Sequence, residues 1–456
     1  MEAAGNFVLR DEKSTVKNQG EAKATIDENY LTLTVDFGDP LLFSYADITN
    51  IQDHDYTIDI DFTSKEKLTL TRMGYQYEDF LFQLFKLRNE QLLKYLLMQE
   101  SLLQAGFEAQ YTSTTPNEQI QTGKCEIRLY ETALLVLPQK NQPIRLPYCY
   151  ISQIIKGDYK LTITDENQQK IELTQLGVNF DPMAKGLSDA YNKMITRSQE
   201  TIKDLIPEAD PIAIRKIASQ MKDGRAAKRK DIQVLSTTFW SRLTNKIQEA
   251  NLKSEYDFLN SLSIQDQECV GIKRGLMGDL TGSYIWMLFP MRDPSSGKLS
   301  NTVAMEAFNI QNAQQEDQPP TDQGSEKEET TESPQTNATG ATYFFKIMQQ
   351  NEFTDTSENE YESRLSEFIT SINRAMIDVN FRREPIYLSD EQLQNTKYTQ
   401  YRFAIQNMPS LKLLRNLFVG RAIHSSLEQW KANVLSLLAF NTKSLTDNEK
   451  SKKEEP

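Results

Sequence analysis

The chain has 456 residues, of which 38% are hydrophobic and 25% are charged, and these proportions are usual for a soluble globular protein. This length predicts about three domains. The formal net charge of -13 excludes a protein that coats nucleic acid through bulk positive charge, although a local basic patch could still bind it. The sequence contains no run of about 18 apolar residues, so no membrane span is predicted. The first residues lack the basic and apolar regions of a secretory signal.

The first predicted domain covers residues 1–105 and combines strands with one helix. Residues 30–35, 56–62 and 67–71 alternate apolar and polar side chains, which is typical of strands with one buried face. The period then changes, because apolar residues from Phe80 to Leu96 recur at helical spacing. We therefore expect an amphipathic helix over residues 77–98 after a small antiparallel sheet.

Residues 45–74 match residues 148–177 without a gap, at a constant offset of 103. Ten of the 30 columns are identical, whereas about two would agree by chance at average residue usage. The identical pairs include Tyr45/Tyr148, Asp55/Asp158, Tyr56/Tyr159 and Gly74/Gly177. A repeat unit of about 100 residues is domain-sized, so the sequence indicates a duplicated domain rather than a solenoid.

The second predicted domain covers residues 106–198 and repeats the order of the first. Its strands are expected at residues 125–129, 133–137, 144–146, 160–164 and 170–174. A helix follows, with apolar residues from Met183 to Ile195 on one face. Several short antiparallel strands followed by one helix predict a small barrel or sandwich with the helix packed across an open end.

The rest of the chain is predicted to hold a third β region between two helical regions. Residues 199–265 form a helical linker with breaks at Pro207 and Pro211. Residues 266–388 form a third domain, with strands at 284–289, 301–308 and 342–347 before a helix. A helical C-terminal region is expected over residues 389–442.

Two segments are predicted to be disordered. Residues 311–340 contain seven acidic residues against one lysine, and they contain no leucine, isoleucine, valine or aromatic residue. Such a segment cannot bury enough apolar surface to offset its ordering entropy, so we read it as an insertion into the third domain. The charged residues 443–456 are predicted to be a disordered tail.

The strand count, the unit length and the helices after Thr71-Arg-Met-Gly74 and Thr174-Gln-Leu-Gly177 resemble the pleckstrin-homology-like (PH-like) superfold, in its bacterial and GRAM-like variants. The resemblance covers residues 6–198 and, more loosely, residues 270–380. It implies an α+β fold of tandem PH-like small antiparallel β-barrels, each closed by a C-terminal helix, with helical linker and C-terminal modules. Domains of this kind are commonly adaptors that bind lipid head groups, peptides or other proteins, and they are rarely enzymes.

Histidine and cysteine are too scarce for the usual metal or catalytic motifs. His54 and His424 are the only histidines, and neither lies in a zinc-ligand spacing or a nucleophile motif. Cys125, Cys149 and Cys269 are odd in number and widely spaced, which fits a reducing cytoplasm and not a disulfide framework. We therefore predict a cytoplasmic protein that is not an enzyme, with no catalytic residue, no metal and no cofactor.

Residues 215–230 carry the densest positive charge, with seven basic residues against Asp223. With two cations of the glycine-spaced segment 271–278, they form a predicted anion- or lipid-binding set. The set comprises Arg215, Lys216, Lys222, Arg225, Lys228, Arg229, Lys230, Lys273 and Arg274. Residues 215–230 could instead pair with the acidic segment or form a solvated helix and turn, and a loop or strand edge is the favoured interpretation of 271–278.

His54 and the repeated pairs Asp55-Tyr56 and Asp158-Tyr159 lie where a turn joins two predicted strands. The counterpart of His54 in the second copy is Gly157, which favours a surface turn. An aspartate at a turn before an aromatic strand residue is expected for structural reasons. The pairs could also mark a shared binding edge.

The leading hypothesis is a non-enzymatic scaffold or adaptor that binds other proteins through its PH-like domains. The alternative is peripheral association with a membrane through anionic phospholipid head groups at residues 215–230. The predicted partner is therefore a protein or, in the alternative, an anionic membrane surface. Nucleic acid is not expected, because no aromatic residues interleave the basic ones.

Overall fold

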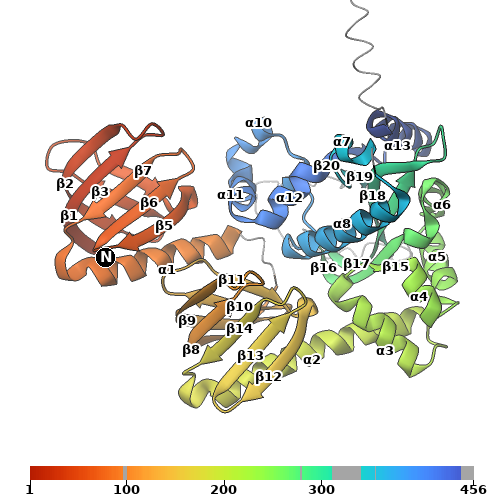
Figure 1. The fold of residues 1–456 in the computed structure, drawn as a ribbon, viewed down its shortest axis with the longest axis horizontal. Coiled ribbons are helices and arrows are strands. Elements are labelled where there is room, and N and C mark those ends of the chain that lie inside the picture. Colours follow the sequence, from red (N-terminus) through yellow and green to blue (C-terminus); the bar gives the residue numbers. More distant parts are fainter. Residues whose placement is uncertain (96–99, 278–279, 311–339, 355, 443–456) are drawn as a thin grey trace, which may run out of the picture. The chain divides into compact units, whose positions relative to one another are not determined.

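The computed structural model describes residues 1–95, 100–277, 280–310, 340–354 and 356–442 (Figure 1). The segments predicted to be disordered, 311–340 except for Gly340 and 443–456, lie outside the described residues. The chain divides into unit 1, residues 1–194 with 388–412, and unit 2, residues 195–387 with 413–456. Both units combine helices with curled antiparallel sheets, so the predicted α+β class is confirmed.

Unit 1 begins with a seven-stranded antiparallel sheet, sheet A, in the order β4-β3-β2-β1-β7-β6-β5. Its strands are β1 (Glu2–Arg10), β2 (Val16–Ile26), β3 (Tyr30–Thr34), β4 (Leu41–Ser44), β5 (Ile48–His54), β6 (Thr57–Phe62) and β7 (Lys67–Thr71). The first strand pairs with the last, at Phe7 opposite Leu70. Helix α1 (Tyr77–Tyr95) follows, and its residues Phe80, Leu81 and Leu84 are buried in the same core cluster as the strands.

Sheet B has the same strand order, β11-β10-β9-β8-β14-β13-β12. Its strands are β8 (Leu102–Thr114), β9 (Ile120–Tyr130), β10 (Ala133–Pro138), β11 (Ile144–Pro147), β12 (Ile151–Gly157), β13 (Lys160–Asp165) and β14 (Lys170–Thr174). Helix α2 (Phe180–Leu205) then begins. Its Gly186 permits a close approach to the sheet, because a Cβ there would lie 2.9 Å from Leu129 Cδ1.

The structure reproduces the sequence repeat at the same offset. Strands β5, β6 and β7 have the same bounds as β12, β13 and β14 once 103 is added to their numbers, and the 3-10 turns at residues 45–47 and 148–150 do so too. Gly74 and Gly177 both have a positive φ, of 57° and 54°. Glycine adopts this conformation with little strain, which explains why both copies keep it at the entry to the helix.

Tyr45 and Tyr148 are buried tyrosines whose hydroxyl groups hold the turn before β3 and before β10. Tyr45 Oη donates to the carbonyl oxygens of Asp27 and Tyr30, at 2.8 and 2.9 Å. Tyr148 Oη donates to the carbonyl oxygen of Tyr130 at 3.0 Å. These equivalent bonds explain why both copies carry tyrosine at this column.

Replacing Tyr45 by phenylalanine is expected to lower the free energy of unfolding of unit 1 by about 1 to 2 kcal/mol, because the two carbonyl groups lose the one hydroxyl donor that they share. Chemical denaturation followed by intrinsic fluorescence measures the loss. The matched control is Tyr56→Phe, because Tyr56 is 73% exposed and the substitution removes the same atom. Equal losses in both variants would contradict the structural role of the Tyr45 hydroxyl.

The repeated Asp-Tyr pairs have the geometry of the predicted turns. Tyr56 and Tyr159 have positive φ values of 59° and 52°. Their rings contact the first residue of the following helix, with centroids 5.4 Å apart for Tyr56 and Tyr77 and 5.7 Å apart for Tyr159 and Phe180. His54 ends β5 with an exposed side chain. The structural interpretation therefore explains the pairs without a binding role.

The residues of unit 1 that come from the C-terminal region are helical. They include α10 (Asp390–Leu393) and α11 (Thr399–Asn407), and α11 lies against α1. The region predicted as one helical module, residues 389–442, therefore contributes to both units. Helix α12 (Pro409–Leu417) spans the boundary between the two units, and the strand and helix that follow it belong to unit 2.

Unit 2 contains a six-stranded antiparallel sheet, sheet C, whose strands follow one another in chain order. They are β15 (Ala227–Lys228), β16 (Cys269–Met277), β17 (Leu280–Arg292), β18 (Leu299–Asn309), β19 (Ala341–Lys346) and β20 (Phe418–Ile423). Strand β20 lies within residues 389–442, which the sequence predicted as a helical region. This short segment pairs with β19, with Ala422 opposite Thr342, and such a distant partner leaves no local pattern.

Helices precede, interrupt and follow the strands of sheet C in the chain (Figure 1). They are α3 (Pro211–Gln220), α4 (Arg229–Leu235), α5 (Phe239–Glu249), α6 (Lys253–Leu262), α7 (Gln350–Thr354), α8 (Glu358–Asp378), α9 (Glu384–Tyr387), α12 (Pro409–Leu417) and α13 (Leu427–Thr442). Asp210 caps α3 by accepting hydrogen bonds from the backbone of Ile212 and Ala213. One apolar cluster contains residues from helices α3, α4, α5, α6 and α13 and from the strands of sheet C.

Candidate functional site

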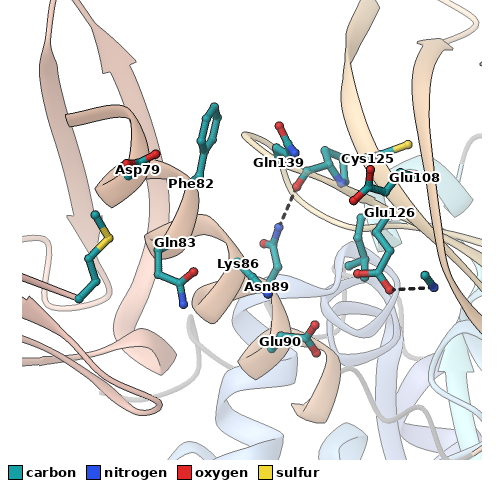
Figure 2. Close-up of a pocket in the computed structure, with 14 residues that line it drawn as sticks. Asp79, Phe82, Gln83, Lys86, Asn89, Glu90, Glu108, Cys125, Glu126 and Gln139 are labelled. Carbon is teal, nitrogen blue, oxygen red and sulfur yellow. Dashed lines mark hydrogen bonds between the residues drawn. The ribbon is translucent and has the colours of Figure 1, made fainter. Parts of the chain in front are cut away.

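Unit 1 contains a cleft of about 680 Å³ between α1 and the strands β8, β9 and β10 (Figure 2). The α1 wall consists of Asp79, Phe82, Gln83, Lys86, Asn89 and Glu90. The opposite wall includes Glu108 on β8, Cys125 and Glu126 on β9, and Leu137 and Pro138 on β10. We call this hollow the α1 cleft.

The sequence of α1 explains how one helix packs on sheet A and also lines the cleft. The cleft residues of α1 recur three or four positions apart, which places them on one side of the helix. Phe80, Leu81, Leu84 and Phe85 recur at the same spacing on the other side, where they join the core of sheet A. The helix therefore covers sheet A with one face and presents a polar face to the cleft.

Two contacts hold α1 against sheet B at the base of the cleft. Leu93 packs against Leu135 and Leu137 in a small apolar cluster. Asn89 Nδ2 donates to the carbonyl oxygen of Asn141 at 2.9 Å. It also donates to the carbonyl oxygen of Pro138 at 3.4 Å (Figure 2). The position of the α1 wall relative to β10 is thus fixed by packing and by hydrogen bonds.

Arg128 organises the carboxylates at one end of the cleft. Its guanidinium group forms a bidentate pair with Glu90, at 2.5 and 3.2 Å, and its Nε donates to Glu126 at 2.8 Å. Hydrogen bonding from Arg128 lowers the pKa of Glu126, so this carboxylate stays ionised. Burial acts to lower the pKa of Arg128, but its bonds to Glu90 and Glu126 outweigh that effect and raise it.

Two carboxylates of the cleft are exposed and unpaired. Asp79 and Glu108 have no ion-pair partner in the part of the chain that the structure describes. Glu108 also lies directly opposite Glu126 in the β8–β9 ladder. Like charges at directly opposed positions destabilise a sheet, so a cation would be favourable beside this pair.

Asn89 leaves one buried acceptor without a partner. Its side chain is 3% exposed, and its Oδ1 accepts no hydrogen bond from any described residue. A buried polar atom without a partner costs about 1 to 3 kcal/mol. Cys125, by contrast, is a poor candidate for chemistry, because burial raises the pKa of its thiol to about 12.

Three members of the predicted anion-binding set form ion pairs with acidic residues of unit 2. Lys273 and Asp223 form a buried pair at 2.5 Å. Arg229 pairs with the buried Glu268 at 3.0 Å, and Arg274 pairs with Asp204 at 2.8 Å. Asp223, the partner of Lys273, lies within residues 215–230. Part of the charge of the predicted set is therefore neutralised by ion pairs within the fold.

The other members of the set are spread over several elements. Arg215 and Lys216 are exposed on α3, and Lys230 is exposed on α4. Lys228 Nζ donates to Ser366 Oγ at 2.7 Å, and Lys222 and Arg225 are half-buried. Residues 271–277 lie in strand β16, which agrees with the favoured interpretation of that segment. Anion binding by the set stays a prediction.

His424, which the sequence left without a role, lies in a polar network of unit 2. Its Nε2 is 2.9 Å from Glu306 Oε2, and its ring stacks on Trp430 with centroids 5.0 Å apart. Burial lowers the pKa of His424, but the hydrogen bond to Glu306 outweighs it and the net pKa is raised. Thr342 Oγ1 donates to the same carboxylate at 2.5 Å, so the network ties β18 to β19.

The described residues contain neither a candidate membrane-spanning helix nor a candidate metal cluster. No described helix is long and apolar enough to cross a membrane. Within the same residues, no group of three or more histidine, cysteine, aspartate or glutamate side chains is placed to hold a metal ion.

Comparison with known proteins does not identify the chain. No protein-family model and no curated protein matches it. Among solved structures, a chain in "Structure of the Spt16D Pob3N heterodimer" is similar at 15% identity and a TM-score of 0.15, over 36% of this chain and 82% of that chain. This similarity is too low to assign the chain to a family.

Sequence reasoning missed the α1 cleft entirely. Its residues come from Met1, from one helix and from three strands with the residue that follows them, up to 138 positions apart from Met1 to Gln139, and none belongs to a motif. The polar face of the predicted helix was the only available signal, and such a face normally lies in solvent.

Proposed function

We propose that the chain is a non-enzymatic scaffold or adaptor that binds another protein, with PH-like domains in unit 1 and the α1 cleft as the binding site. The strand count, the unit length, the first-to-last pairing of β1 with β7 and of β8 with β14, and the helix after each sheet support the PH-like interpretation. Since one fold serves many functions, the proposal rests on the site.

The observation that carries the proposal is the cleft itself. Its volume of about 680 Å³ falls in the usual range for binding sites, and its walls combine apolar Phe82, Leu137 and Pro138 with ionised side chains. Its one cysteine is a protonated, buried thiol, so the cleft offers no activated nucleophile from that residue. This lining suits recognition of an extended segment of another protein.

Site-directed photo-crosslinking in the native cell tests the proposal. A photoreactive amino acid in place of Gln139, an exposed residue of the cleft rim, is expected to capture one protein reproducibly, as identified by mass spectrometry. The matched control replaces Gln19, an exposed glutamine on β2 that does not line the cleft. Capture of the same proteins at both positions, or turnover of a small molecule by the purified chain, would contradict the proposal.

A further inference from the structure

We infer that the α1 cleft binds an arginine-bearing segment of the partner protein, whose guanidinium group sits between α1 and β8–β10 and donates to Asn89 Oδ1. This inference rests on the proposed function and names the chemistry of the partner at the same site. Three independent features of the cleft carry it: its charge, its unpartnered acceptor and its shape.

The charge of the cleft favours a cation. Four carboxylates line it, namely those of Asp79, Glu90, Glu108 and Glu126. Three nearby cations oppose them: Lys86 and the terminal ammonium group of Met1 in the lining, and Arg128, which Glu90 and Glu126 already engage, so one negative charge is in excess. Asp79 and Glu108 form no ion pair with a described residue, and they lie on opposite walls of the cleft (Figure 2), so each wall offers one unpaired carboxylate to a cationic segment.

Lys140 does not supply this cation. Its ammonium group already pairs with Asp53 at 3.1 Å and with Glu78 at 3.3 Å, neither of which lines the cleft. Its Nζ also lies 5.2 Å from the centroid of the Phe82 ring. Lys140 is therefore engaged by carboxylates outside the lining, and it forms no ion pair with Asp79 or Glu108.

The unpartnered Asn89 oxygen indicates that the ligand donates hydrogen bonds. The amide nitrogen of Asn89 is held by two carbonyl groups, which fixes the orientation of the side chain and leaves Oδ1 as a free acceptor among the described residues. An anionic ligand such as a phosphate would bring only acceptors to this oxygen and to the carboxylates. A donor-rich cation satisfies both.

Arginine fits these features better than lysine. A guanidinium group presents five donors in a planar fork, so one group can reach an amide oxygen and a carboxylate together. It is also less strongly hydrated than an ammonium group, which suits a cleft with an apolar side formed by Leu137 and Pro138. The volume of about 680 Å³ exceeds one side chain, so neighbouring residues of the segment enter with it.

Fluorescence anisotropy with a defined probe tests the inference on the full chain. The probe is a short fluorescein-labelled peptide in which arginine alternates with serine, and the comparison peptide carries neutral citrulline in place of each arginine. Asp79→Asn with Glu108→Gln is expected to weaken binding of the arginine peptide by about tenfold or more. The control, Asp36→Asn with Asp39→Asn, removes the same charge from an exposed turn outside the cleft and is expected to leave binding unchanged.

Asn89→Leu is a second, sterically matched variant, but it also removes two structural hydrogen bonds, so circular dichroism must first show that it folds. Equal binding by the Asp79/Glu108 variant, equal loss in the Asp36/Asp39 control, or equal binding of the citrulline peptide would each overturn the inference.

Competition separates this inference from the proposed function. The arginine peptide, but not the citrulline peptide, is expected to displace the protein that is crosslinked through position 139. If that protein is captured in a cleft-dependent way and the arginine peptide does not displace it, the arginine inference fails while the scaffold proposal stands. If no protein is captured at all, the scaffold proposal itself fails.

Discussion

Replacing Gly271 by alanine is expected to lower the free energy of unfolding of unit 2 by about 3 kcal/mol, because the added methyl group has no space. A Cβ at this position in β16 would lie 2.2 Å from Trp286 Nε1 and 2.3 Å from the carbonyl oxygen of Gly224. Both distances are far inside van der Waals contact. The backbone or the tryptophan must move to admit a single carbon atom.

Neither neighbour can move at little cost. Trp286 is fully buried, and its Nε1 donates to the carbonyl oxygen of Gly224 at 2.6 Å. Displacing the ring breaks this bond and leaves a buried donor unsatisfied, which costs about 1 to 3 kcal/mol in addition to the strain. Gly224 has a φ of 88°, so its turn tolerates few alternative conformations.

Gly157→Ala is the matched control for this substitution. A Cβ at Gly157, the last residue of β12, would meet only the carbonyl oxygen of Lys160, at an ordinary 3.7 Å. Its counterpart in sheet A is His54, which carries a side chain at the same point of the hairpin. The control is expected to change stability by less than about 0.5 kcal/mol. Equal thermal denaturation of the two variants would refute the steric argument at Gly271.

The repeat made unit 1 predictable from sequence. The columns that both copies keep are core positions such as Ile60 and Leu70, which are buried, and turn positions such as Gly74, whose φ is positive. These requirements act over a few residues, so they leave a pattern that local reasoning can read. The same reasoning left residues 271–278 as a loop or strand edge, and it could not anticipate that Gly271 faces a tryptophan on the next strand.

Features made by distant partners were not predictable. Strand β20 takes its partner from β19, more than 70 residues earlier, from Ala341 to Phe418, and its own sequence has no strand alternation that stands out from the helices around it. The α1 cleft likewise depends on the packing of Leu93 against sheet B. The basic set could be read from the sequence, but its ion pairs with Glu268 and Asp204 could not, because nothing local distinguishes a paired arginine from a solvated one.

Replacing Arg229 by methionine is expected to lower the free energy of unfolding of unit 2 by about 3 to 5 kcal/mol at about pH 8, because it leaves a buried carboxylate without its cation. Glu268 is fully buried, and Arg229 Nη1 donates to its Oε2 at 3.0 Å. Ser263 Oγ donates to the other carboxylate oxygen. The guanidinium group also lies 4.6 Å from the centroid of the Trp240 ring, a contact that methionine replaces only in part.

The loss of stability in Arg229→Met is expected to depend on pH, because it depends on whether Glu268 is ionised. Burial raises the pKa of Glu268 from its usual 4.5 to about 7, against the opposing effects of the Ser263 hydrogen bond and the Arg229 charge. Between these two values the folded chain holds a proton that the unfolded chain has released. The stability from protonated Glu268 is therefore complete below 4.5 and is lost as the pH rises through about 7, a difference of about 3 kcal/mol. Near pH 5.5, where Glu268 is mostly protonated, the Arg229→Met loss is expected to shrink to about 1 to 2 kcal/mol.

Adding Glu268→Gln to Arg229→Met is expected to recover most of the lost free energy of unfolding at about pH 8, because the glutamine amide leaves no unpaired charge in the core. Glu268→Gln alone should flatten the fall in stability with rising pH. The control is Arg242→Met on α5, whose pair with Glu208 at 3.1 Å is solvent-exposed and is expected to contribute little to stability. Denaturant titrations of the four variants across this pH range measure all of these values. A loss in Arg229→Met that is the same at both pH values, or that Glu268→Gln fails to recover, would show that Arg229 stabilises unit 2 by packing on Trp240 and not by neutralising Glu268.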